Sequence, residues 1–157
     1  GMCTFPNGHK YEGEVKNSRP DGKGVFSWPD GHKYEGLFKD GKPHGRGIMS
    51  YPEGRRCEGN WTNGELNEGT EITDINIEDV KNYKKAIYKG QFKNGEKHGH
   101  GVMTIYNQFG NIGFKYVGEF KNNAMFGRGV GIIYDRNGKK EVTQDGWWED
   151  GKFLGDK

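Results

Sequence analysis

The chain has 157 residues, a length that corresponds to one domain or one repeat array. Leucine and alanine, the best apolar helix formers, occur only three and two times, whereas there are 28 glycines and 13% of the residues are aromatic. This composition argues against a helical bundle. The aromatic content and a net charge of only +2 argue against a disordered chain. Basic and acidic residues alternate without long runs, so we expect no nucleic-acid partner.

The cysteine count indicates a reducing compartment. Cys3 and Cys57 are too few to build a disulfide scaffold, which favours a cytoplasmic location and two free thiols. No apolar run approaches the roughly 18 residues of a transmembrane helix.

A repeated triad organises the chain. Its form is Tyr-Glu-Gly or a close variant, followed in most units by two glycines eleven and thirteen residues after the triad begins. The triads begin at Tyr11, Tyr34, Cys57, Tyr88, Tyr116 and, in degraded form, Gln144. The spacing predicts one array over residues 1–157, with repeats starting near 11, 34, 57, 88 and 116, partial units at both ends and an insertion at 73–86.

Two turn signals alternate within each unit. One is an Asp-Gly or Asn-Gly pair such as Asp40-Gly41, which suits a type I′ hairpin because both residues accept positive φ. The other is a Pro-x-Gly segment such as Pro29–Gly31. A turn therefore falls every 11 or 12 residues and leaves strands of five to seven residues. The pattern predicts an all-β, antiparallel meander of hairpins.

Alternation along each strand assigns the side chains to two faces. Tyr34, Gly36 and Phe38 are expected on one face, and Glu35 and Leu37 on the other. Interior glycines normally weaken a strand, but here we expect them to let neighbouring rings lie flat across bare backbone. A single-layer sheet could bury its rings in this way.

Two segments interrupt the regular pattern. The insertion, around residues 74–86, is predicted to be either a short capped helix or a lengthened hairpin. Residues Asn107–Phe114 are predicted to form a longer turn.

Residues 34–47 carry a family resemblance. They read Tyr-Glu-Gly, any residue, Phe-Lys-Asp-Gly-Lys, any residue, His-Gly, any residue, Gly, which closely resembles the MORN repeat (membrane occupation and recognition nexus). The resemblance implies an elongated, twisted single-layer meander with a groove. Cys57 and Gln144 in place of tyrosine, and the later 28-residue spacings, depart from the pattern.

The same resemblance bears on function. Family members serve as scaffolds, as receptors for partner segments, as lipid-proximal modules, and as accessory domains of lipid kinases and methyltransferases. It implies association with the cytoskeleton or with membranes.

Motifs for catalysis are missing. None of the three serines lies in Gly-x-Ser-x-Gly, and residues 127–131 lack the Lys-Ser/Thr of a phosphate-binding loop. His98 and His100 share a face but have no third ligand between them. We therefore expect no catalytic residue, no metal and no cofactor.

Two functional classes remain. The first is a protein-binding scaffold that receives a peptide or helix of a partner along an aromatic groove. Its expected anchors are the large rings of the first units: Trp28, Tyr51, Trp61, Tyr34 and Phe38.

The second class is a peripheral module that binds anionic phospholipids or phosphoinositides through basic side chains. The candidates are Lys10, Lys16, Lys39, Lys42, Arg46, Lys93 and Lys97. The identity of the partner, the parent protein and the oligomeric state stay open at this point.

Overall fold

The computed structural model describes residues 1–74 and 83–156, and in these residues every regular element is a β-strand. The chain divides into two compact units, Gly1–Glu71 and Ile72–Lys157. The all-β class and the meander of antiparallel hairpins are confirmed within each unit. That residues 1–157 form one array stays a prediction.

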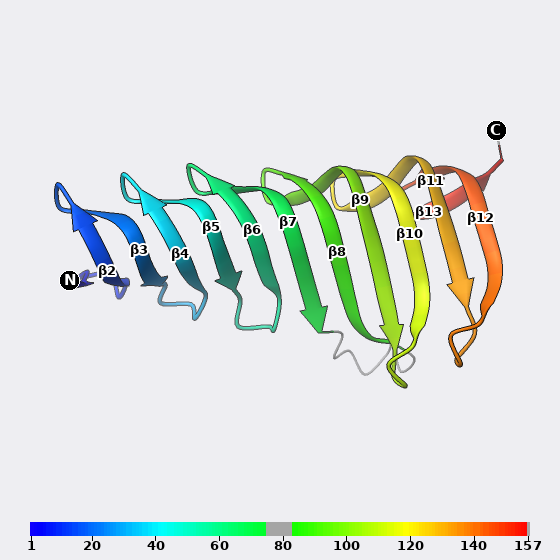
Figure 1. The fold of residues 1–157 in the computed structure, drawn as a ribbon, viewed down its shortest axis with the longest axis horizontal. Coiled ribbons are helices and arrows are strands. Elements are labelled where there is room, and N and C mark those ends of the chain that lie inside the picture. Colours follow the sequence, from blue (N-terminus) through cyan, green and yellow to red (C-terminus); the bar gives the residue numbers. More distant parts are fainter. Residues whose placement is uncertain (75–82, 157) are drawn as a thin grey trace. The chain divides into compact units, whose positions relative to one another are not determined.

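The first unit holds seven strands in chain order, coloured blue to green in Figure 1, and each pairs antiparallel with the next. They are β1 (Met2–Thr4), β2 (Lys10–Lys16), β3 (Arg19–Ser27), β4 (Lys33–Lys39), β5 (Lys42–Ser50), β6 (Arg56–Thr62) and β7 (Glu65–Asp74), whose last residues pass into the second unit.

The described residues of the second unit hold six strands, coloured green to red in Figure 1, again paired antiparallel in chain order. They are β8 (Tyr83–Lys93), β9 (Glu96–Asn107), β10 (Ile112–Lys121), β11 (Ala124–Tyr134), β12 (Lys140–Glu149) and β13 (Lys152–Gly155).

Both predicted turn types occur. Asp40 and Gly41 have φ angles of 51° and 85°, as the type I′ turn requires. At the Pro-x-Gly turn after β3, the Trp28 amide donates to the His32 carbonyl (3.0 Å) and the Gly31 amide donates to the Trp28 carbonyl (3.1 Å). This closed five-residue turn sets the register between one repeat and the next.

Strands extend into both predicted interruptions. Thr73 and Asp74 belong to β7, and residues 83–86 belong to β8; the remainder of the insertion, 75–82, lies outside the described residues. The longer turn predicted at Asn107–Phe114 is wrong for its second half, because β10 already begins at Ile112. The Asn107 amide donates to the Asn111 carbonyl (2.8 Å), so this turn is the same five-residue type as the one after β3.

The core of each unit lies on one face of its sheet, here called the ring face. Tyr11, Tyr34, Tyr88 and Tyr116 are its most deeply buried large side chains. Each hydroxyl donates to the carbonyl three residues later, as from Tyr34 to Leu37 (2.9 Å). The strand therefore bends over the ring, and a single layer encloses its own core.

Candidate functional site

The ring face places three of the five predicted anchors in the core. The Tyr34 ring meets Phe38 edge to face at 5.0 Å between centroids, and meets Trp61 in the same way at 5.4 Å. The Trp61 indole nitrogen donates to the Gly47 carbonyl (3.1 Å). All three side chains are at most 6% exposed. A partner could reach them only by opening the first unit.

The other two predicted anchors, Trp28 and Tyr51, are half-buried beside the turns between repeats. The Trp28 indole stacks on the His32 imidazole at 4.2 Å, and His32 in turn lies 5.8 Å from the Tyr51 ring. The Arg55 guanidinium lies over the Tyr51 ring, 4.0 Å from its centroid. These rings stabilise the turns. Binding of a partner by any of the five residues stays a prediction.

His32 and Arg55 were missed as members of this stack. Both occupy the fourth position after the ring that opens a Pro-x-Gly turn, so their spacing was the available signal. Arg55 also lies 4.0 Å from the carboxylate of Glu71, which is buried. A repeat search that aligned only the triads could not identify this second ladder.

Burial also shifts the acid–base behaviour of the core. It raises the pKa of Tyr34 to about 12, and that of Tyr116 likewise to about 12. Both phenols therefore stay neutral over the physiological range.

The opposite face of the first unit carries a different arrangement, built around paired glycines. Gly24 of β3 lies opposite Gly36 of β4 in the register. On either side of this pair, Lys23 lies opposite Leu37 and Val25 lies opposite Glu35. Four side chains of different chemistry therefore surround a patch of bare backbone.

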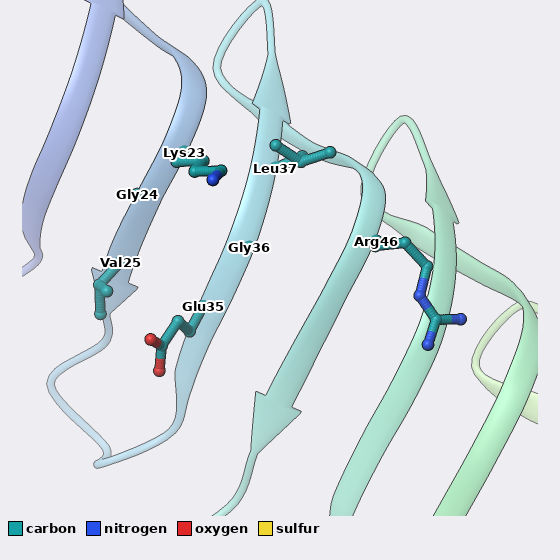
Figure 2. A pocket seen from close by; sticks show the side chains of 7 residues that line it. All are labelled: Lys23, Gly24, Val25, Glu35, Gly36, Leu37 and Arg46. Atoms are coloured by element: carbon teal, nitrogen blue, oxygen red, sulfur yellow. The ribbon is translucent and has the colours of Figure 1, made fainter.

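A hollow of about 530 Å³ opens at this patch, here called the β3–β4 hollow. Figure 2 shows the four side chains around the two glycines, with the Arg46 side chain standing on the neighbouring strand β5. Leu37 is 38% exposed, an appreciable fraction for a leucine on a sheet. The hollow has a basic corner, an acidic corner and two apolar corners.

A basic and an acidic residue also lie diagonally across a glycine pair at two other places where repeats meet. Around the pair Gly47 and Gly59, the basic residue Arg46 reaches the acidic residue Glu58 at 3.4 Å. Around Gly129 and Gly146 in the second unit, an arginine and an aspartate, Arg128 and Asp145, pair at 2.9 Å.

The β3–β4 pair differs from both. Across the described residues, the ammonium of Lys23 and the carboxylate of Glu35 form no ion pair within 4.0 Å. The ion pair that crosses the glycines at these two places is therefore absent at the β3–β4 hollow.

A hydrogen bond from a backbone amide to a side-chain oxygen, which recurs in other repeats, is also missing beside the β3–β4 hollow. In three repeats a side-chain oxygen accepts the backbone amide that follows the first glycine of the return strand. The pairs are Glu14 with Lys23 (2.6 Å), Gln91 with His100 (3.0 Å) and Glu119 with Arg128 (3.0 Å). Leu37 takes this position in the second repeat, so its side chain offers the Arg46 amide no acceptor.

Three of the seven predicted lipid-binding residues lie beside hairpin turns of the first unit, and the others are dispersed. In the first unit Lys16, Lys39 and Lys42 flank two hairpin turns, whereas Lys10 starts β2 at the other end of that strand. The remaining three are Arg46, which pairs with Glu58, Lys97, whose ammonium lies 5.7 Å from the Tyr88 ring centroid, and the exposed Lys93.

Within residues 1–74 and 83–156, no three His, Cys, Asp or Glu side chains gather as metal ligands would. The described part of the chain also holds no helix of the length and apolarity that a membrane crossing demands.

These features define a protein of the β-hairpin repeat class, with a ring core on one face and charged corners on the other. A family model described as the MORN repeat matches residues 11–33, 34–54, 88–108 and 116–130, together half of the chain. The chain belongs to the MORN-repeat family. The matched ranges do not include the repeat predicted to start at Cys57. No curated protein matches the chain. MORN repeats are in general modules that bind proteins or membranes, and the family is typically non-catalytic.

Proposed function

We propose that this chain is a non-catalytic protein-interaction module, and that its first unit holds a segment of a partner protein at the β3–β4 hollow. The observation that carries the proposal is the open glycine pair, Gly24 and Gly36, between the apolar side chains Val25 and Leu37. The volume of about 530 Å³ falls in the range of roughly 300–1,000 Å³ that ligand sites occupy.

The chemistry of the hollow suits a protein side chain. Without β-carbons at its centre, a partner's apolar group can approach the sheet backbone closely, and Val25 and Leu37 then cover its sides. An interaction of this kind resembles the anchor-in-pocket contacts that dominate protein interfaces.

A displayed library of random 12-residue peptides, selected on the immobilised chain, tests this proposal. One enriched peptide is then synthesised and titrated calorimetrically against wild type and Leu37→Ser. We expect Leu37→Ser to weaken binding at least tenfold. Ile48→Ser is the matched control, because Ile48 lies on the same face and is also 38% exposed but does not line the hollow. It should change affinity less than threefold.

Circular dichroism establishes that both variants keep their strands. The proposal fails if no peptide is enriched over an empty support, or if enriched peptides bind wild type and Leu37→Ser equally.

Binding to anionic lipid is a second candidate, favoured by one observation at the hairpin tips. Lys16 lies opposite Arg19 in the strand register beside one turn, and Lys39 lies opposite Lys42 beside the next. The two tips touch, because the Gly41 amide donates to the Pro20 carbonyl (2.9 Å). Four cations therefore gather in the first unit, each able to contribute about 1 kcal/mol at an anionic surface.

Co-sedimentation with vesicles of phosphatidylcholine and phosphatidylserine, at 50 and 300 mM salt, tests this candidate. Lipid binding should fall steeply as salt rises, and Lys39→Glu with Lys42→Glu should abolish it. Equal sedimentation of the wild type with vesicles of phosphatidylcholine alone would exclude the electrostatic mechanism.

A further inference from the structure

Lys23 and Glu35 carry opposite charges diagonally across the glycine pair but form no ion pair, and are here called the open clasp. Where such a pair is formed, the clasp is called closed. From this we infer that the β3–β4 hollow selects partner segments in which an acidic and a basic side chain flank an apolar one. The inference rests on the proposed function, since it specifies the partner of that same site. It comes from comparing the hollow with the two equivalent places where the clasp is closed.

The closed examples both use arginine. Arg46 reaches Glu58 at 3.4 Å and Arg128 reaches Asp145 at 2.9 Å, in each case across a glycine pair. An arginine carries a longer side chain than lysine and a planar fork that matches a carboxylate. Lysine at position 23 keeps the charge but does not bridge to Glu35. The basic residue is therefore lysine at the open place and arginine at both closed ones.

The open clasp costs nothing while water covers it, because Lys23 and Glu35 are both exposed. A partner that seats an apolar group on Gly24 and Gly36 removes part of this water. Each charge then loses hydration, and the loss is offset only by an opposite charge on the partner. The partner must therefore bring a carboxylate to Lys23 and a cation to Glu35.

The positions of the lining residues also determine on which side of the hollow each charge of the partner lies. Lys23, Leu37 and Arg46 lie along one side of the hollow, whereas Val25 and Glu35 lie along the other (Figure 2). The basic residues thus occupy one side and the free acidic residue the other. In addition, Leu37 offers no acceptor to the backbone amide of Arg46. At the matching positions of other repeats, Glu14, Gln91 and Glu119 each accept the equivalent amide. The partner's carboxylate belongs on this basic side.

The decisive variant is Lys23→Arg, which keeps the charge and gives position 23 the residue type that closes the clasp elsewhere. We expect it to pair with Glu35, cover the glycines and weaken the enriched peptide at least tenfold, with no loss of thermal stability. Lys33→Arg is the matched control, since it makes the same exchange at an exposed position on the same face, and it should change affinity less than twofold.

The peptide provides the complementary test. Peptides enriched on wild type should carry an acidic and a basic residue around an apolar one, and replacing both charged residues by glutamine should weaken binding at least tenfold. The inference is overturned if the glutamine peptide binds as well as its parent, or if Lys23→Arg binds like wild type, while Leu37→Ser still weakens binding at least tenfold. That result would leave an interaction site that recognises apolar groups alone. Loss of the Leu37 dependence itself would instead remove the proposed function.

Discussion

A β-carbon on Gly47 would overlap the hydroxyl of Tyr34, because the Tyr34 ring lies directly on the Gly47 backbone. The two residues belong to adjacent strands of one hairpin, and Gly36 lies opposite Gly47 in the register. The ring is fully buried in this way without a second layer of structure above it. The glycines of the repeat are therefore part of the core packing.

Gly47→Ala is expected to destabilise the first unit by about 3 kcal/mol, since overpacked cores lose roughly 1–3 kcal/mol. Gly64→Ala is the control: it adds a methyl group in open space at a positive φ of 88°, and should cost only about 1 kcal/mol of backbone strain. Urea unfolding followed by tryptophan fluorescence measures both. Equal losses in the two variants would contradict the packing role.

Leu37→Glu should stabilise the chain. The new carboxylate can accept the Arg46 amide as Glu14 accepts the Lys23 amide at 2.6 Å, and a net hydrogen bond contributes about 1 kcal/mol. The same change should weaken peptide binding at the β3–β4 hollow. Leu37→Ala, which adds no acceptor, should show no gain in thermal midpoint. If the two variants melt together, the acceptor has no role in stability.

The buried tyrosines predict a loss of stability at alkaline pH. The unfolded phenol has a pKa near 10, whereas burial raises the pKa of Tyr34 and Tyr116 to about 12. Between these values the unfolded state has released a proton that the folded state retains, so stability falls as pH rises from about 10 to 12 and is unaffected below pH 10.

Urea midpoints measured from pH 9 to pH 11.5 test this dependence. The double variant Tyr34→Phe with Tyr116→Phe is the control, and its stability should fall less over the same range. If the stability of the variant fell as much as that of the wild type, the effect would belong to other groups.

The two thiols should react at very different rates. Cys3 is exposed, whereas Cys57 is 5% exposed and its sulfur lies 3.8 Å from the Glu71 carboxylate. Iodoacetamide on the native chain, without reductant, should modify Cys3 quickly and Cys57 only through unfolding. Intact mass should therefore show one adduct in native buffer and two in guanidinium chloride. Rapid double labelling of the native chain would place Cys57 at the surface.

The turn types and the two faces of each strand were predictable because they depend on residues close together in the chain. The pair Asp40-Gly41 requires positive φ at both residues, and the structure shows it. Alternation correctly separates Tyr34 and Phe38 from Glu35 and Leu37, because successive side chains of a strand point to opposite faces. Strand identity, turn type and face are all set by residues within one hairpin.

The assignment of rings to a binding site shows where this reasoning stops. Trp61 and Trp28 both read as large rings in phase with the repeat, yet Trp61 is buried against Tyr34 and Trp28 stacks on His32. Periodicity assigns a residue to a face, but the depth of a side chain depends on which neighbours bend over it. That bending follows from hydrogen bonds such as Tyr34 to Leu37.

The sequence by itself determined the repeat, the strands, the turns and the membership of each face, because these depend on residues close together in the chain. Only the tertiary structure decided that Lys23 and Glu35 flank an open glycine pair while Arg46 and Glu58 close the next one. Those relationships depend on the register between strands of successive repeats and on the reach of individual side chains. A one-residue change in register would move every one of these side chains to the other face, so no local pattern specifies them.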